Sequence, residues 1–264
     1  MKQISKDLTA EYDALDNIIK DLTDDQWLTQ TPFFNWRIKD EISHIAYFDR
    51  AAYFSATDAA AFQKDMEKML EGFVDYSQMH KKVNALGDAM SPQDLLAWWR
   101  KTREQLIDAY ESLSPKDRLP WYGPSMSAKS SATARLMETW AHGQDIVDTL
   151  QIKRDPTDRL QHIAHIGFKT YEWSFKNRQI AVPETTIRLE LKSPSGDIWE
   201  WGDPNASNRV YGDVDAFCLV VTQRRNFADL DSLKADGSAA KQWMQIAQAF
   251  AGPPENPPPP GKRV

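Results

Sequence analysis

The sequence predicts an α+β protein in which a four-helix bundle precedes a small mixed α/β domain. Up to about residue 152, apolar residues recur at the three- and four-residue spacing of amphipathic helices. Beyond that point, short segments alternate apolar and polar residues, which is typical of strands with one buried face. The length of 264 residues also exceeds that of most single domains. We therefore expect two domains.

Amphipathic helices account for the first half of the predicted bundle. A stripe of apolar residues predicts a helix from about residue 5 to residue 22, and the Thr31-Pro32 pair places a loop after it. A second helix is expected to begin near Trp36. Helical spacing continues between residues 60 and 86, although Gly72 argues against an unbroken helix there.

The second half of the bundle has clearer helix boundaries. Ser91-Pro92 supplies a capping serine and a proline at the first helical position, and Ser114-Pro115 ends that helix. The next loop leads into a helix that contains Glu138 and His142. Four long antiparallel helices with short connections form a bundle that can build a metal site from side chains of facing helices. We place this bundle at residues 1–152.

The remaining chain predicts a small α/β domain at residues 153–252. We expect a helix over about residues 158–176, strands over residues 187–191, 197–201 and 208–212, and helices after Asp213 and over residues 238–250. The turn residues Ser193-Pro194-Ser195-Gly196 join the first two strands into a hairpin. Residues 253–264 are rich in proline and predict an extended tail on the surface.

Three side chains are candidate metal ligands. Glu138 and His142 are four residues apart, so a helix places both on one face. His44 lies in the second helical segment. If the two helices pack side by side, two imidazoles and one carboxylate meet around a divalent ion that keeps a free coordination position. Spacing alone also fits a second interpretation, in which each pair is a solvated contact on a helix surface.

A rival ligand cluster lies in the second domain. Asp158, His162 and His165 share one predicted helix and also offer two imidazoles and a carboxylate. The alternative for these residues is a helix face that packs between the domains or is exposed to solvent.

Two sequence motifs around the first set of candidates resemble one protein family. Trp36 followed by Asp40-Glu41-Ile42-Ser43-His44, and later Glu138-Thr139-Trp140-Ala141-His142-Gly143-Gln144-Asp145, resemble signatures of the DinB-like metal-binding superfamily. The similarity is to its branch of mycothiol-dependent maleylpyruvate isomerases. In that branch a histidine on the second bundle helix, together with a glutamate and a histidine four residues apart on the last helix, holds a metal ion. The resemblance therefore implies that His44, Glu138 and His142 are ligands.

The resemblance continues into the second half of the chain. Three segments there are similar to a subgroup with a small C-terminal domain of sterol-carrier-like type: Trp199-Glu200-Trp201-Gly202, Thr222-Gln223-Arg224-Arg225 and Ala247-Gln248-Ala249-Phe250-Ala251-Gly252-Pro253-Pro254.

The proposed ligands predict Lewis-acid chemistry at a divalent ion. Neutral imidazole and carboxylate suit zinc first, and nickel, iron or manganese as well. The resemblance implies a low-molecular-weight thiol cosubstrate, of which mycothiol is one possibility. We therefore expect a thiol-dependent transferase or isomerase that attacks an electrophilic small molecule. Two alternatives are a metal-assisted hydrolase with bound water as nucleophile, and a non-catalytic small-ligand-binding protein with a structural metal.

Four further residues are candidates for supporting roles. Arg224 and Arg225 can grip a substrate carboxylate through paired hydrogen bonds, or they can neutralise the end of a helix. Asp49 and Asp145 can each orient a ligand imidazole, or form an internal salt bridge.

Composition narrows the class of partner. A net charge of −6 argues against nucleic-acid binding, which draws on clustered Lys and Arg, and favours a small-molecule substrate. The longest apolar runs fall short of the roughly 18 residues of a spanning helix, and the first residues lack a signal-peptide core, so we expect a cytoplasmic protein without membrane contact. The only cysteine, Cys218, lies in an apolar run and predicts a buried thiol. Whether the chain forms a homo-oligomer is left open.

Overall fold

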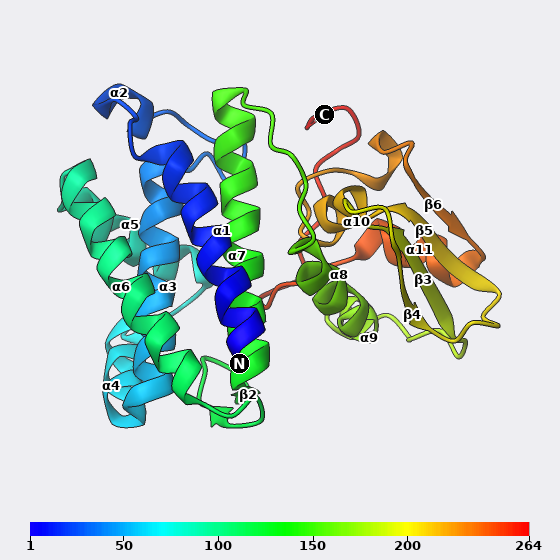
Figure 1. The fold of residues 1–264 in the computed structure, drawn as a ribbon, viewed down its shortest axis with the longest axis horizontal. Coiled ribbons are helices and arrows are strands. Elements are labelled where there is room, and N and C mark those ends of the chain that lie inside the picture. The colour runs from blue at the N-terminus through cyan, green and yellow to red at the C-terminus, as the bar shows by residue number, and fades with distance from the viewer. Residues whose placement is uncertain (264) are drawn as a thin grey trace. The chain divides into compact units, whose positions relative to one another are not determined.

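Helices build the first part of the structure, and a four-stranded sheet lies in the second part (Figure 1). The structure is a computed structural model that describes residues 1–263. Two compact units divide the chain, Met1–Lys153 and Arg154–Val264. This arrangement confirms the predicted α+β class. None of the helices in the described residues combines the length and the apolar character that crossing a bilayer requires.

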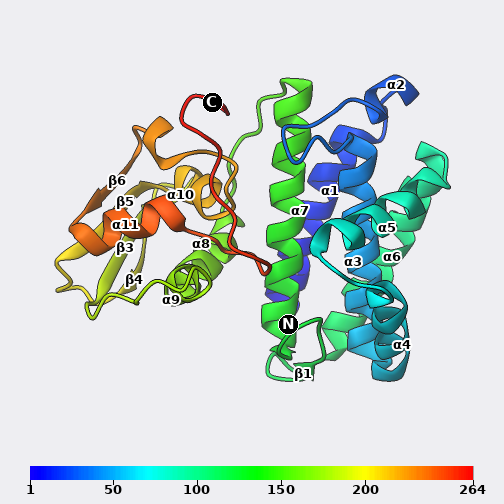
Figure 2. The same cartoon turned by 180° about the vertical axis from the view of Figure 1, so that it is seen from behind.

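Four long helices form the body of the first unit. They are α1 (Lys2–Ile19), α3 (Ile38–Thr57), α6 (Pro92–Ser112) and α7 (Ala128–Leu150). Helix α1 packs against α6 and α7, and α3 packs against the same two helices, so that the four lie side by side in Figures 1 and 2. Shorter elements complete the unit: α2 (Asp24–Trp27), α4 (Ala59–Leu70), α5 (Tyr76–Asp88), β1 (Arg118–Leu119) and β2 (Met126–Ser127).

Local sequence signals explain where several of these helices begin and end. The Ser91 hydroxyl accepts a hydrogen bond from the backbone N–H of Asp94 at 3.1 Å, and Pro92 occupies the first helical position of α6, as predicted. The expected break near Gly72 is also present, because this residue has a φ of +67° after the end of α4. Asp75 then caps α5 by accepting from the backbone N–H of Ser77 at 2.9 Å.

The carboxylate of Asp49 connects all four long helices. It lies on α3, is fully buried, and accepts three hydrogen bonds. Tyr12 on α1 donates at 2.8 Å, Trp99 on α6 at 3.2 Å, and Arg135 on α7 at 2.7 Å. Asp49 therefore takes the second role considered for it, an internal salt bridge, and does not orient an imidazole.

The second unit is a mixed sheet with helices. Its strands are β3 (Ile187–Lys192), β4 (Ile198–Gly202), β5 (Asn208–Asp213) and β6 (Leu233–Asp236), in the order β4-β3-β5-β6. Its helices are α8 (Leu160–Lys169), α9 (Tyr171–Lys176), α10 (Val214–Val221), η1 (Phe227–Asp229) and α11 (Ser238–Ile246). The predicted hairpin is present, since β3 and β4 pair antiparallel, whereas β3 and β5 pair parallel.

Three features of this unit differ from the prediction. The last helix, expected over residues 238–250, ends at Ile246. The single helix expected over residues 158–176 is divided at Thr170, which leaves helical geometry between α8 and α9. Strand β6 was not predicted, because its four residues, Leu233–Asp236, are too short to show a periodic pattern.

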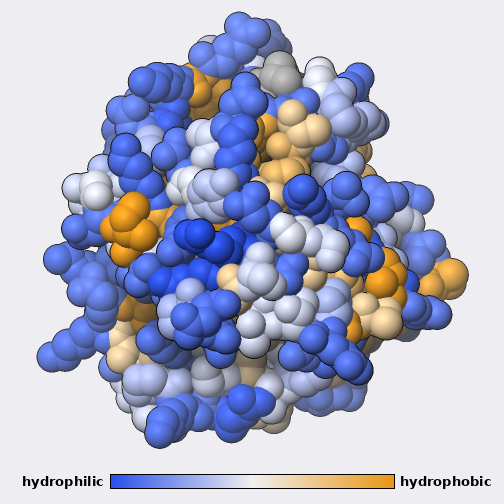
Figure 3. All heavy atoms as spheres, turned by 90° about the vertical axis from the view of Figure 1, so that its right-hand side faces the viewer, coloured by the Kyte–Doolittle hydropathy of each residue, from blue (hydrophilic) through white to orange (hydrophobic). Residues whose placement is uncertain are grey.

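The interior of the second unit is apolar, and the surface on the side shown in Figure 3 is polar. Leu189 and Leu191 of β3 are fully buried, and so is Phe217 of α10. Cys218 is buried beside Phe217, as predicted, and burial raises the pKa of its thiol well above the ordinary value. The face seen in Figure 3 is largely hydrophilic, with its hydrophobic side chains scattered and not gathered into one patch.

The proline-rich tail is held on the second unit by hydrogen bonds. The Gln248 side chain donates to the carbonyl of Pro253 at 3.0 Å and accepts from the backbone N–H of Glu255 at 3.0 Å. Asn226 donates to the carbonyl of Pro258 at 2.9 Å. Because proline carbonyls have no intrasegment partner in an extended chain, side-chain donors of this kind fix its path.

Replacing Asp49 with Asn should destabilise the protein. The substitution leaves the buried Arg135 guanidinium without a counter-charge, and breaking a buried pair in this way costs about 3–5 kcal/mol. Urea denaturation followed by circular dichroism measures the loss. Glu172→Gln, in the exposed pair with Lys176, is the control and should leave the midpoint unchanged. Equal midpoints for the two variants would contradict the role of Asp49.

Candidate metal centre

Helices α3 and α7 run antiparallel, and their register places the candidate residues opposite one another. His44 on α3 faces Glu138 on α7, and five residues later on α3, Asp49 faces Arg135, which lies earlier on α7. Arg135 also donates to the carbonyl of Ile45 at 3.4 Å. The buried ion pair between Asp49 and Arg135 therefore fixes the position along α7 that His44 faces.

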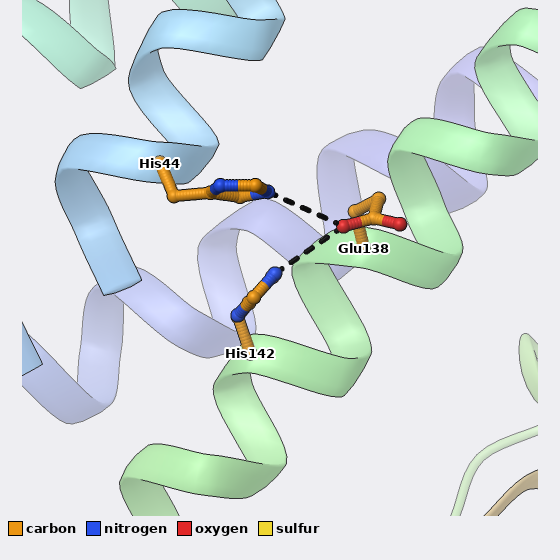
Figure 4. A group of neighbouring side chains, drawn as sticks. All are labelled: His44, Glu138 and His142. Carbon is orange, nitrogen blue, oxygen red and sulfur yellow. Dashed lines mark ion pairs between the residues drawn. The ribbon is translucent and has the colours of Figure 1, made fainter. Parts of the chain in front are cut away.

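His44, Glu138 and His142 point toward one another (Figure 4). The Oε2 atom of Glu138 lies 3.5 Å from Nε2 of His44 and 3.2 Å from Nε2 of His142. One potential ligand atom from each residue lies within 4.8 Å of the other two. The helical spacing of Glu138 and His142 supplies two of these groups, and the packing of α3 on α7 supplies the third.

The second nitrogen of His142 has its own carboxylate partner. Nδ1 lies 2.6 Å from Oε2 of Glu41, which is fully buried and also accepts a hydrogen bond from Thr31 at 2.7 Å. Asp145 is farther away, at 3.8 Å from the same nitrogen. Glu41 is therefore the nearer carboxylate to this nitrogen and is placed to orient the ring, a role that we considered for Asp145 from the sequence. Glu41 lies inside the motif that contains His44. No pattern in the sequence indicates that it contacts His142, which lies on another helix.

The arrangement around His142 fits a bound cation. Both nitrogens of this imidazole face carboxylates, Glu41 on one side and Glu138 on the other. A neutral imidazole carries one N–H and can donate on one side only. A cation held by Nε2 and Glu138 would remove the conflict, because Nδ1–H could then donate to Glu41, as in many histidine metal ligands. The donor set is thus suited to a divalent metal ion.

Burial and charge set the ionisation of the other two groups. Burial lowers the pKa of His44 to about 3, so this imidazole is neutral and has a lone pair for a metal. Burial acts to raise the pKa of Glu138, but the hydrogen bonds and charges of His142 and His44 outweigh it and hold that pKa well below the ordinary value. Glu138 is therefore an anion at neutral pH.

Aromatic rings enclose the centre. The indole of Trp36 lies parallel to the imidazole of His142, with ring centroids 6.0 Å apart, and Phe48 lies 4.7 Å from His44. A further histidine, His80 on α5, lies with its ring 5.0 Å from Trp36 and 6.4 Å from His44. Sequence reasoning missed His80, because it has no acidic or histidine partner at helical spacing.

The three candidate ligands differ in their exposure to solvent. The side chain of His142 is 3% exposed, that of His44 is 12% exposed, and that of Glu138 is 24% exposed. A ligand reaches the three groups most easily along Glu138.

The rival cluster does not assemble. Asp158, His162 and His165 lie at or in α8, but among residues 1–263 none of them belongs to a group of three converging ligands. The carboxylate of Asp158 instead accepts a hydrogen bond from the backbone N–H of Ser195 at 3.2 Å. A second group of converging carboxylates and imidazole, Glu41, His142 and Asp145, shares His142 with the first group and is fully buried.

Arg224 and Arg225 lie just beyond the end of α10 in the second unit. Arg224 is buried and donates to the carbonyl of Thr222 at 2.7 Å, and Arg225 donates to the carbonyl of Arg224 at 2.9 Å. These contacts agree with the neutralised helix end considered from the sequence. A grip on a substrate carboxylate stays a prediction.

Comparisons with known proteins identify the family of this chain. Residues 8–147 match the family described as mycothiol maleylpyruvate isomerase N-terminal domain. The uncharacterized proteins Rv0036c and MT0041, from two strains of Mycobacterium tuberculosis, are each 43% identical over 251 residues, which cover 94% of this chain and 95% of theirs.

Solved structures share the fold. A crystal structure of the mycothiol-dependent maleylpyruvate isomerase has a TM-score of 0.57 and 14% sequence identity, and the match covers 89% of this chain and 92% of that chain. A histidine-to-alanine mutant of that enzyme matches over the same shares with a TM-score of 0.56. At this level of identity the similarity is one of fold.

Replacing Glu41 with Gln should weaken metal binding without abolishing it. The amide keeps the shape of the carboxylate but loses the charge that orients His142 and makes it more basic, and the loss of such a partner typically costs 10–100-fold in affinity. Competition with a coloured zinc chelator measures the dissociation constant. Glu67→Gln, on the exposed face of α4, should bind as the wild type does. Unchanged affinity in Glu41→Gln would exclude this role.

Proposed function

Because the chain belongs to the family of proteins with a mycothiol maleylpyruvate isomerase N-terminal domain, we propose that it is a metal-dependent enzyme that uses a low-molecular-weight thiol against an electrophilic small molecule. The reaction is an isomerisation or the transfer of the thiol. One observation carries the proposal: two imidazole nitrogens and one carboxylate oxygen, from His44, His142 and Glu138, converge within 4.8 Å.

Two imidazoles and one carboxylate fit a divalent ion. Zinc is our first choice, and nickel, iron or manganese accept the same donors. When bound, such an ion lowers the pKa of a coordinated thiol, so that a thiolate nucleophile is available near neutral pH. His44, Glu138 and His142 would hold such an ion with three protein ligands, and the ion could then also bind the sulfur of a thiol.

The protein itself contributes orientation and a dry environment. Glu41 holds the ring of His142 by a 2.6 Å contact, so Nε2 stays on the same side as the Glu138 carboxylate, where both could bind one ion. Trp36 and Phe48 cover the two imidazoles with apolar surface. This apolar surface limits the access of water to the two imidazoles, which strengthens electrostatic interactions around them.

The sulfur has to come from a separate molecule. Cys218 is the only cysteine of the chain, and it is fully buried in the second unit with its thiol donating to the carbonyl of Leu160. Burial also raises the pKa of this thiol, which makes it a poor nucleophile. A cosubstrate such as mycothiol, the thiol in the name of the related enzyme, supplies the nucleophile.

Arg224 and Arg225 are our candidates for binding a carboxylate of the electrophile. A guanidinium binds a carboxylate through two parallel hydrogen bonds, which an ammonium cannot reproduce. Maleylpyruvate, the substrate in the name of the related enzyme, offers carboxylates of this kind.

The His44→Ala, Glu138→Ala and His142→Ala variants should each lose the metal ion. Each substitution removes one of three protein ligands, and two ligands do not retain a divalent ion through purification. Elemental analysis of the purified proteins gives the metal content per chain. His162→Ala and His165→Ala, which remove the other candidate imidazoles, should keep the wild-type content. Stoichiometric metal in all three ligand variants would refute the proposed centre.

Consumption of the electrophile should require an added thiol. We expect the metal-loaded protein to convert maleylpyruvate in the presence of mycothiol and at least 100-fold more slowly without it, because Cys218 cannot replace the cosubstrate. Absorbance of the substrate follows the reaction, and Cys218→Ala should show the wild-type dependence on thiol. Hydrolysis without thiol would instead indicate the metal-assisted hydrolase, and ligand binding without turnover would indicate a binding protein.

A further inference from the structure

The two candidate ligand histidines differ in whether Nδ1, the nitrogen that faces away from Glu138, has a hydrogen-bond partner. Nδ1 of His142 contacts Glu41. Nδ1 of His44 is buried and has no hydrogen-bond partner among the described residues. If Nε2 of His44 binds the metal, its proton lies on Nδ1, which is then a buried donor. A buried donor without an acceptor is unfavourable, so we expect an acceptor close to His44.

The rings around His44 include one with an available acceptor. They are those of Trp36, Phe48, His80 and His142. The indole of Trp36 can only donate, Phe48 has no polar atom, and both nitrogens of His142 already face carboxylates. His80 has no hydrogen bond or ion pair within residues 1–263 and is only partly buried. Its imidazole has one nitrogen that accepts.

We propose that His80 is a positioning residue that accepts, through one water molecule, the hydrogen bond donated by Nδ1–H of His44. The centroids of the two rings are 6.4 Å apart, which is too far for a direct hydrogen bond. One water molecule with two hydrogen bonds of about 2.8 Å each can join ring nitrogens up to about 5.6 Å apart, which is within reach for rings at this centroid distance. The inference rests on the proposed metal centre. In it, His80 orients the ring of His44 as Glu41 orients the ring of His142.

Helix α5 holds His80 in a fixed place relative to His44. The hydroxyl of Ser43, the residue before His44, donates to the carbonyl of Val83 on α5 at 2.7 Å. A Cβ at Gly87 of α5 would lie 2.8 Å from Cβ of Ser43, so glycine is needed for this close approach. Val83 is also fully buried, in an apolar cluster with Phe48. The position of His80 therefore follows from the packing of α5 on α3.

Two variants at position 80 separate a hydrogen bond from packing. His80→Phe keeps a ring against Trp36 but has no acceptor, whereas His80→Gln keeps an acceptor without the ring. We expect the first variant to bind Co(II) about 10-fold more weakly than the wild type, and the second to stay within threefold of it. Competition with a chelator on the full-length protein measures both affinities. His165→Phe, on the exposed side of α8, should show the wild-type affinity.

Proton NMR of the Co(II)-loaded protein gives a second readout. The wild type should show two exchangeable, metal-shifted N–H signals, one from His44 and one from His142. The His44 signal should broaden through exchange with solvent in His80→Phe and stay sharp in His80→Gln, because only the second variant holds the proton in a hydrogen bond.

Three other results of these experiments would contradict the role of His80 or the metal centre. Wild-type affinity and two sharp signals in His80→Phe would overturn the role of His80 and leave the metal centre in place. If both variants bound Co(II) equally weakly, the imidazole ring of His80 would contribute only packing. This result would also overturn its role as an acceptor. A wild type that binds no Co(II) would overturn the centre and this inference together. If the Co(II) affinities and the N–H signals were as expected but turnover did not depend on a thiol, the role of His80 would be supported and the proposed reaction rejected.

Discussion

The buried carboxylate of Asp49 is the interaction on which the first unit depends. An ionised carboxylate inside a protein is costly unless its oxygens are satisfied, and here the donors come from three other helices, through Tyr12, Trp99 and Arg135. Apolar packing alone tolerates small rotations and shifts of one helix against another. A charge with three directional partners does not, so this residue fixes the mutual register of α1, α3, α6 and α7.

The candidate centre uses the same register. Arg135 lies three residues before Glu138 on α7, and Asp49 lies five residues after His44 on α3, so the ion pair and the ligand set are neighbours along both helices. On the other side of the centre, Glu41 contacts His142 across the same pair of helices. The site therefore lies between two polar contacts that hold α3 against α7. Such a rigid frame suits a metal ion, whose affinity depends on ligands that are already in place.

The two units divide the chemistry of the chain between them. The first unit holds the imidazoles and carboxylates of the candidate centre, together with the aromatic rings that cover it. The second unit holds the only thiol, which is buried, and the adjacent pair Arg224 and Arg225. A reaction that needs a sulfur nucleophile therefore depends on a thiol from outside the protein. The single buried cysteine is consistent with the use of an external thiol such as the mycothiol in the description of the family.

The sequence by itself determined those features that depend on neighbours along the chain. The start of α6 at Ser91-Pro92, the break at Gly72, the β3–β4 hairpin and the shared helix face of Glu138 and His142 all follow from local spacing and backbone preference. Only the tertiary structure placed Glu41 against His142, His80 near His44, and Asp49 among its three donors. These contacts join residues 36 to 101 positions apart, and helical periodicity carries no information about the register or rotation of one helix against another.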